Sequence, residues 1–183
     1  GLIQNDVNVL WDLAVHDLAI LNYISKLNPI EVSAVGHKHI KNKPETAAYL
    51  TIKYQNNFIA HINVNWLSPV KIRKTILGGS NKMIVYNDLE PSDKIIIYKK
   101  GVNIVKKQNS SANLIKYKIG DTLIPSLKNK EALAEAVSEF YRSIKEKRFN
   151  SKSNGNDGLN VVNILEAADK SMAKNGKPMK VSK

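Results

Sequence analysis

Asp12 and His16 are the two residues whose types and spacing could carry out proton transfer in this chain of 183 residues. They lie four positions apart in a segment with helical periodicity, so their side chains share one side of the helix, about one turn apart. Histidine titrates near neutral pH and can accept and return a proton, while a nearby carboxylate can orient the imidazole or a substrate hydroxyl. The same spacing is common for a pair on a helix surface, and Asp17 is an alternative carboxylate. The pair alone leaves a catalytic and a structural role open.

The other histidines are weaker candidates. His37 and His39 are two positions apart in a predicted strand, where both imidazoles would share one face and could bind a metal ion. No third ligand is close in sequence, so we predict no metal site. His61 is predicted to face away from the core side of a hairpin. The chain has no cysteine, which excludes disulfides, thiolate metal sites and cysteine nucleophiles.

No motif for a nucleotide cofactor is present in the sequence. The glycines of Gly78-Gly79-Ser80 form a predicted turn, but no Lys-Ser or Lys-Thr follows, so this is not a phosphate-binding loop. A G-x-G-x-x-G pattern is also missing from the sequence. We therefore predict no cofactor-binding residue in this chain.

The chain is strongly basic, with 28 lysines and arginines, 16 acidic residues and a net charge of +12. Such a field can attract anions. Arginine occurs only at positions 73, 142 and 148, and aromatic residues are not interleaved with the basic ones, so we predict a solvated lysine-rich surface and no nucleic-acid partner. No apolar run approaches the roughly 18 residues of a membrane span, and no signal segment opens the sequence. We expect a soluble, cytoplasmic protein with no membrane partner.

The hydrophobic periodicity predicts an α+β fold with an open, predominantly antiparallel β-sheet and helices packed on one face, forming a single domain over residues 1–183. Helices are predicted over residues 6–24, 128–147 and 157–172, with Asp157 as the N-cap of the last. Strands are predicted over residues 31–40, 48–54, 58–66, 71–77, 82–86, 94–99, 114–119 and 178–182. The segment 102–122 is the least regular part of the pattern.

One face of the predicted hairpin is polar. It carries the side chains of Tyr49, Thr51, Lys53, His61, Asn63 and Asn65. This face is too polar for a core but is compatible with a hydrated contact between copies of the chain. We therefore expect a homo-oligomer that forms through the open sheet face.

The stretch Asn5-Asp6-Val7-Asn8-Val9-Leu10-Trp11-Asp12-Leu13-Ala14-Val15-His16-Asp17-Leu18 resembles the D-x-x-x-H helix of the Gfo/Idh/MocA oxidoreductases. The similarity continues through residues 65–73 and 79–86, and then through Asp157-Gly158-Leu159, Leu165-Glu166-Ala167-Ala168 and Ser171. It covers nearly all of the chain, and the order of these stretches matches the C-terminal domain of that family.

The resemblance implies the substrate-binding and catalytic half of an NAD(P)-dependent oxidoreductase that acts on a secondary hydroxyl of a sugar or nucleotide sugar. It implies that His16 is the acid/base that takes the hydroxyl proton as hydride leaves for the nicotinamide. It further implies that Asp12 holds or polarises that hydroxyl, and that Asn8 and Trp11 lie near the substrate. The cofactor would be NAD or NADP in the full-length protein.

Two departures from the family bear on these expectations. The sequence begins at Gly1, and we expect a fragment that lacks the family's N-terminal nucleotide-binding domain and is inactive by itself. Val15 stands where the sugar-nucleotide branch often has proline, which leaves the substrate branch open. The alternative is a non-enzymatic module that self-associates through its sheet or binds an anionic ligand through its lysines. A preceding strand, Gly-rich turn and helix would favour the enzyme.

Overall fold

The computed structural model describes residues 3–106, 113–128, 130–148 and 154–182. The chain divides into two units, one formed by Gly1–Pro69 with Ala136–Lys183 and the other by Val70–Glu135. All residues of the site described below belong to the first unit.

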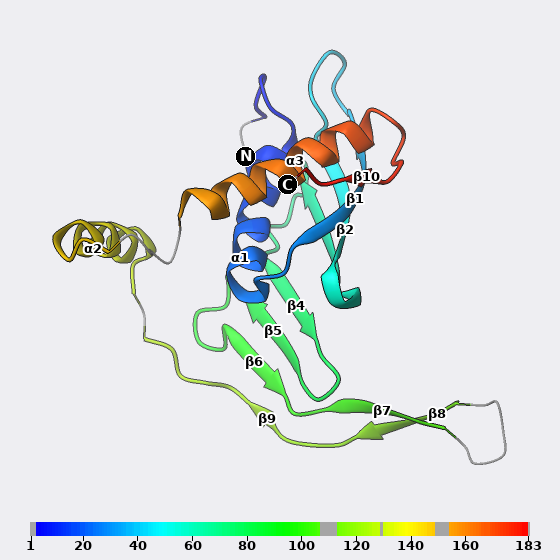
Figure 1. The fold of residues 1–183 in the computed structure, drawn as a ribbon, viewed down its shortest axis with the longest axis vertical. Coiled ribbons are helices and arrows are strands. Elements are labelled where there is room, and N and C mark those ends of the chain that lie inside the picture. The colour runs from blue at the N-terminus through cyan, green and yellow to red at the C-terminus, as the bar shows by residue number, and fades with distance from the viewer. Residues whose placement is uncertain (1–2, 107–112, 129, 149–153, 183) are drawn as a thin grey trace. The chain divides into compact units, whose positions relative to one another are not determined.

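A four-stranded antiparallel sheet in the order β10-β1-β2-β3 forms the base of the first unit (Figure 1). The strands are β1 (Pro29–His37), β2 (Ala47–Tyr54), β3 (Ile59–Asn65) and β10 (Met179–Lys180). The predicted hairpin is confirmed, because β2 pairs with β3 from Ala47 opposite Asn65 to Lys53 opposite Ile59. Apolar side chains alternate with polar ones along both strands, so only one face of the hairpin is buried.

Three helical segments cover that apolar face: a π-helical turn η1 (Leu10–Ala14), the helix α1 (Val15–Ser25) and the helix α3 (Gly155–Met172). Helix α3 packs on β1 and against α1 (Figure 1), and the turn η1 packs on β3. The largest fully buried apolar side chains come from both layers and are Leu10, Leu18, Leu50, Ile52, Ile164, Leu165, Val9 and Val32. The sheet and the helices thus share one core, which fixes the helices over the sheet.

Several element boundaries differ from the sequence prediction, and three of them bear on the first unit. Helical structure begins at Leu10 rather than Asp6, and β1 ends at His37 rather than Ile40. Helix α3 is capped by Asn154 rather than by Asp157, whose backbone N–H donates to the Asn154 side chain. The Asp157 carboxylate accepts in return from the Asn154 backbone N–H, so the two residues form a capping box.

Ser171 of α3 links the helix layer to the edge of β1. Its fully buried Oγ accepts from the Ala34 N–H at 2.9 Å and donates to the Lys177 carbonyl at 2.8 Å. The pairing of β10 with β1 is confined to Glu31 and Val32, so this hydroxyl serves a β1 N–H beyond that pairing. After the helix, Gly176 adopts a φ of +83°, and a Cβ there would approach the Val35 side chain to 2.8 Å. Glycine is therefore required where the chain turns back toward β10.

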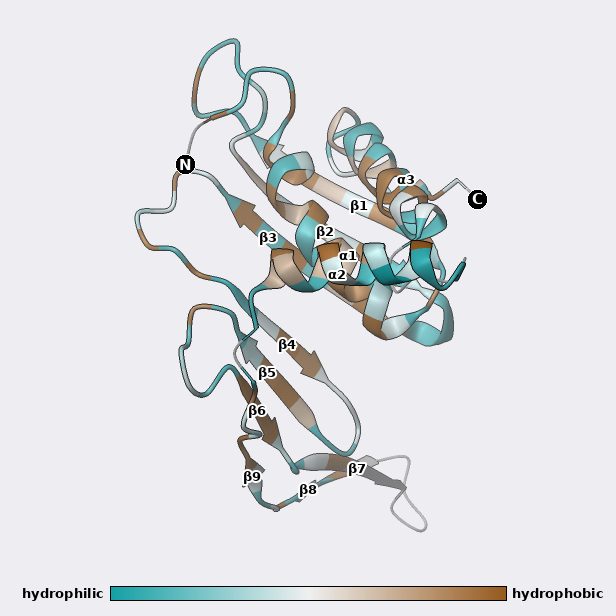
Figure 2. Ribbon diagram, turned by 90° about the vertical axis from the view of Figure 1, so that its left-hand side faces the viewer, coloured by the Kyte–Doolittle hydropathy of each residue, from teal (hydrophilic) through white to brown (hydrophobic). Residues whose placement is uncertain are grey.

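The second unit contains a four-stranded sheet in the order β4-β5-β6-β9 and a two-stranded ribbon of β7 and β8. The strands are β4 (Lys74–Gly78), β5 (Met83–Asn87), β6 (Ile95–Tyr98), β7 (Gly101–Lys106), β8 (Asn113–Lys118) and β9 (Thr122–Leu123). Figure 2 shows that β4, β5 and β6 are mostly hydrophobic along their length. The sequence prediction found β4, β5, β6 and β8 but missed β7, which is followed by a polar stretch, and β9, which is only two residues long.

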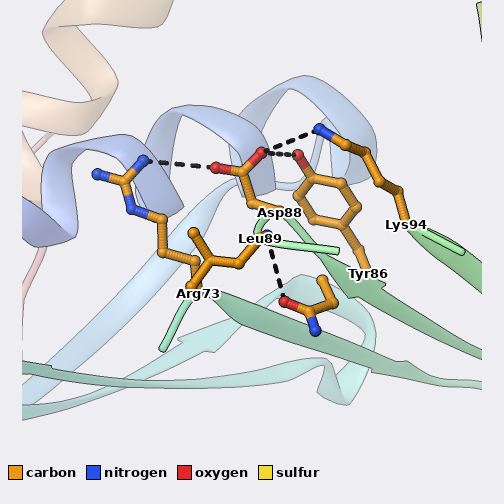
Figure 3. Close-up of polar contacts among 6 residues, drawn as sticks. Arg73, Tyr86, Asp88, Leu89 and Lys94 are labelled. Atoms are coloured by element: carbon orange, nitrogen blue, oxygen red, sulfur yellow. Dashed lines mark hydrogen bonds and ion pairs between the residues drawn. The ribbon is translucent and has the colours of Figure 1, made fainter. Parts of the chain in front are cut away.

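A cluster of polar side chains joins the strand ends of this second sheet (Figure 3). The Asp88 carboxylate accepts from Tyr86 Oη at 2.8 Å and lies 3.4 Å from the Arg73 guanidinium and 4.0 Å from Lys94 Nζ. These contacts hold the pKa of Asp88 below its ordinary value, chiefly through the Tyr86 hydrogen bond. Burial and the neighbouring carboxylate raise the pKa of Tyr86.

Helix α2 (Ala132–Lys145) has one strongly apolar side, and none of its described residues is buried. Among the helices that the structure describes, none is long and apolar enough to cross a membrane. Taken with the two antiparallel sheets, the helices confirm the predicted α+β fold class.

Replacing Ser171 with Ala should lower the free energy of unfolding by about 1–3 kcal/mol, because the Ala34 N–H and the Lys177 carbonyl lose their buried partner. Urea unfolding followed by far-UV circular dichroism measures this loss. Glu166→Ala, an exposed position on the same helix, is the control and should change stability by less than about 0.5 kcal/mol. Equal stability of the Ser171→Ala variant and the parent chain would contradict the assigned role.

The second unit should lose stability in acid through Asp88. Because the folded pKa of Asp88 is lowered, its contribution is present above its unfolded pKa and is lost as pH falls through the folded value. An Asp88→Asn variant lacks this dependence. Thermal unfolding at pH 6 and pH 3 should therefore show a smaller acid-induced drop in the variant, and an identical drop would contradict the assignment.

Candidate functional site

The segment that carries the predicted site begins with a π-helical turn. The Val15 N–H reaches back to the Leu10 carbonyl, five residues earlier, which widens the turn before α1. The Asn8 side chain accepts from the Leu10 N–H at 3.0 Å and so serves one of the free donors at the start of the helical segment. Single π-turns are rare and are often found at functional sites. Helical periodicity in the sequence could not distinguish this turn from α-helix.

Backbone hydrogen bonds attach this segment to the sheet. The Val9 N–H donates to the Glu45 carbonyl at 3.0 Å, just before β2. Thr46, which is fully buried, donates its N–H to the His37 carbonyl at 2.9 Å and accepts from the Trp66 N–H at 2.9 Å. The start of the helical segment, the end of β1 and the end of β3 are therefore fixed around one buried threonine.

Asp12 is held by a side chain from the end of β3. Trp66 is only 9% exposed, and its indole Nε1–H donates to Asp12 Oδ2 at 2.6 Å. A hydrogen bond to a charged carboxylate is stronger than one between neutral groups. The contact fixes the orientation of the Asp12 side chain and occupies one of its two oxygens. The carboxylate can still accept further hydrogen bonds from other groups.

His16 lies in the first turn of α1, four residues after Asp12, and its side chain is exposed. An exposed imidazole on a fixed helix can reach a proton on a bound molecule. Asp17, the alternative carboxylate, is half-buried and is engaged in an interaction of its own. The geometry thus leaves Asp12 as the carboxylate that is both oriented and one helical turn from His16.

Asn8 and Trp11, the two predicted substrate-binding residues, are brought together by a residue that sequence reasoning missed. Asp169 of α3 accepts from Asn8 Nδ2 at 2.8 Å on one oxygen and from Trp11 Nε1 at 2.7 Å on the other. The missed signal is the position of Asp169 four residues after the buried Leu165, which places a carboxylate on the apolar side of the helix. A charged side chain on the buried side of a helix is rare unless it has a partner. The sequence therefore offered Asp169 as a candidate for a hydrogen bond to another element.

A cavity of about 830 Å³ opens beside these residues. Its walls are residues 5–8, residues 42–45, Trp11, Lys38 and Asp169, and all belong to the first unit. Its volume is within the range of small-molecule sites. Asn8 and Trp11 therefore line a cavity of substrate size, while Asp12 and His16 follow on the same helical segment.

The histidines outside this segment have other surroundings. The rings of His37 and His39 meet edge to face at 4.6 Å, and His39 Nδ1 lies 2.7 Å from the Thr46 hydroxyl, beyond the end of β1. The prediction that both share a strand face is wrong, because β1 ends between them. Among the described residues, no group of three or more metal-ligating side chains is found. His61 lies exposed on the open sheet face beside Tyr49, as predicted.

The Gly78-Gly79-Ser80 stretch ends β4 and turns into β5, with the Gly79 N–H donating to the Lys82 carbonyl at 3.0 Å. A dinucleotide site of the Rossmann type needs a glycine turn followed by a helix. In the part of the chain that the structure describes, this glycine turn leads into a strand, so these residues do not fit NAD or NADP by that mode.

A family model described as the GFO/IDH/MocA C-terminal domain matches residues 4–85. No curated protein matches the chain. Among solved structures, UDP-N-acetylglucosamine 3-dehydrogenase GnnA from Acidithiobacillus ferrooxidans is similar with a TM-score of 0.70 and 19% identity, over 92% of this chain and 48% of that chain.

Two further solved structures are similar. An oxidoreductase domain protein from Kribbella flavida has a TM-score of 0.73 at 13% identity, over 96% of this chain and 50% of that one. An oxidoreductase from Agrobacterium radiobacter, in complex with NAD+, L-tartaric acid and magnesium, has a TM-score of 0.66 at 14% identity, over 94% and 49%. At these identities the likeness shows the fold, and the chain spans about half the length of these proteins.

A double-mutant cycle tests whether Trp66 holds Asp12. Trp66→Phe and Asp12→Ala should each lower the free energy of unfolding, and the coupling between them should be about 1–3 kcal/mol because the hydrogen bond is charge-assisted. Urea unfolding of the two single variants and the double variant gives this coupling. The pair Trp66→Phe and Glu166→Ala serves as the control and should be additive. Additivity of the Trp66 and Asp12 changes as well would contradict the contact.

Proposed function

Because residues 4–85 of this chain belong to the GFO/IDH/MocA C-terminal domain family, we propose that the chain is the substrate-binding and catalytic half of an NAD(P)-dependent oxidoreductase. Its substrate is a sugar or nucleotide sugar that reacts at a secondary hydroxyl. The observation that carries this proposal is that Asn8 and Trp11 line a cavity of about 830 Å³, while Asp12 and His16 follow in the continuous helical segment from Leu10 to Ser25. The similarity to a nucleotide-sugar dehydrogenase in fold supports the substrate class.

In this proposal, the substrate ring lies in the cavity against Trp11 and Asn8, and its reacting hydroxyl extends toward Asp12 and His16. Asp12 keeps one oxygen on the Trp66 indole, and its other oxygen holds the reacting hydroxyl through a hydrogen bond whose hydrogen is shared with the His16 imidazole. His16 takes the hydroxyl proton as general base in oxidation and returns it as general acid in reduction. Holding the hydroxyl between two fixed groups lowers the entropic cost of reaching the transition state.

NAD or NADP supplies a hydride acceptor when bound, and the full-length protein would hold it outside the residues described here. We propose residues 1–183 as the single catalytic and oligomerisation domain, joined in the full-length protein to a nucleotide-binding domain. An enzyme that depends on this cofactor fits a cytoplasmic location. The oxidised carbon must lie where both halves meet, so activity requires both.

A homo-oligomer through the open sheet face is a second part of the proposal. The outward side chains of β2 and β3 include Tyr49 at 50% exposure, with its ring stacked near His61 at 6.4 Å. Lys53 on the same face forms an ion pair with Glu31 at 2.8 Å. Such a mixed aromatic and polar surface is typical of hydrated protein contacts. The same face also supports the alternative, a non-enzymatic module that only self-associates. In that alternative His16 has no catalytic role, whereas the oxidoreductase requires it.

The role of His16 is tested in the full-length protein with a nucleotide sugar and NAD+ or NADP+. His16→Ala should lower kcat by about 10²- to 10⁴-fold, because a general base is lost. Absorbance at the nicotinamide band measures turnover. His37→Gln changes an exposed histidine that does not line the cavity and should leave kcat within about twofold. A His16→Ala enzyme as active as this control would overturn the proposed acid/base and favour the association module.

A further inference from the structure

We propose that Asp169 determines which ligands enter the cavity. Its carboxylate positions Asn8 and Trp11 and accepts a hydrogen bond from a hydroxyl of a neutral sugar ring. The same negative charge repels anionic groups. The inference rests on the proposed function, because it assumes that the cavity holds the substrate. It adds a residue of α3 to the site, more than 150 positions away from Asn8 and Trp11 in sequence. Asp169 touches ligand and acts as a specificity residue rather than as the acid or base of the reaction.

The Asp169 carboxylate has acceptor positions left for a ligand. Asp169 accepts from Asn8 Nδ2 on Oδ1 and from Trp11 Nε1 on Oδ2, at 2.8 and 2.7 Å. An ionised carboxylate has about four acceptor positions. Two are used by these contacts, and Asp169 itself lines the cavity. The remaining acceptor positions can therefore receive hydroxyl hydrogens of a bound molecule.

Asp169 also fixes the side chains of Asn8 and Trp11. Asn8 is held at both ends, because its Oδ1 accepts from the Leu10 N–H and its Nδ2 donates to Asp169. Trp11 packs against the core and has its single polar atom bound by Asp169. Both side chains are thus set before a ligand arrives, which reduces the entropic cost of binding. An indole held in this way offers an apolar surface for the C–H groups of a sugar ring.

The charged side chains that line the cavity are mostly acidic. The cavity is lined by three carboxylates, those of Asp6, Glu45 and Asp169, and by two lysines. Lys38 lies 3.4 Å from Glu45, and Lys43 donates to the Asn5 side chain. Within the described part of the chain Asp169 forms no salt bridge, and its charge is met by neutral donors. The cavity is therefore acidic on a chain whose net charge is +12.

This charge distribution predicts the orientation of a nucleotide sugar. A neutral ring with several hydroxyls can donate to Asp169, whereas a carboxylate or phosphate at the same place meets a like charge without a donor hydrogen. A like charge at about 4 Å weakens binding by roughly fivefold even in a water-like medium. The diphosphate of such a ligand would thus lie outside the cavity, with the ring inside.

The test compares two probes of equal shape, methyl β-D-glucopyranoside and methyl β-D-glucopyranosiduronate, by titration into the ¹⁵N-labelled chain at pH 7. The wild type should bind the neutral glycoside at least about fivefold more tightly. Asp169→Asn should reduce that preference to about twofold or less. Glu166→Gln removes one exposed charge from the same helix and should keep the full preference.

The two tryptophan side chains give an independent readout, because Trp11 and Trp66 are the only two in the chain. In Asp169→Asn the indole N–H signal of Trp11 should shift, while that of Trp66, bound to Asp12, should stay and report an intact fold. If the Asp169→Asn variant loses the Trp66 signal, its fold is disturbed, and the Asp169→Glu variant is used in its place. The Glu variant keeps the charge and should keep the preference for the neutral glycoside.

The outcomes separate the two claims. If both glycosides bind the wild type and Asp169→Asn changes neither the preference nor the Trp11 signal, the role of Asp169 is overturned and the proposed function stands. The role is likewise overturned if the folded Asp169→Glu variant loses the preference. If neither glycoside binds the wild type or Glu166→Gln, the cavity is not the substrate site, and the proposed function fails together with this inference.

Discussion

The geometry of the site depends on how residues 8–16 are held against the rest of the first unit. Three distant partners hold this short segment: the Glu45 carbonyl binds the Val9 N–H, the Trp66 indole binds Asp12, and Asp169 binds Asn8 and Trp11. Each partner comes from a different element, before β2, after β3 and from α3. The buried side chains of Leu10, Ala14 and Leu18 pack the same segment onto the core, so core packing and these polar contacts together fix its rotation.

This arrangement explains why the sheet and the functional segment cannot be separated. The apolar side chains of β1, β2 and β3 bury one sheet face under α1 and α3, and that burial brings Asp169 beside Trp11. Ser171, two residues further along α3, serves the edge of β1. The same helix therefore completes both the core and the cavity, so a change that shifts α3 should alter ligand contacts as well as stability.

Sequence reasoning predicted the hairpin of β2 and β3 and the apolar stripes of α1 and α3, because alternation with period two and recurrence every three to four residues are local signals. The resemblance to a known family supplied Asp12, His16, Asn8 and Trp11. Asp169 and Trp66 were not predicted as partners, since a hydrogen bond over 158 or 54 positions leaves no periodic signal. The separation of His37 from His39 by the end of β1 was missed because strand ends depend on tertiary pairing.

The central claim is that a sugar ring lies against Trp11 in the cavity, with its reacting hydroxyl toward Asp12 and His16. The most direct measurement is a set of intermolecular nuclear Overhauser effects between a bound nucleotide sugar and the ¹³C,¹⁵N-labelled chain. The account predicts contacts from the sugar-ring protons to the Trp11 indole and the His16 imidazole, and none from that ring to Tyr49 on the open sheet face. Sugar-ring contacts to Tyr49 or elsewhere, with none to Trp11, would contradict it.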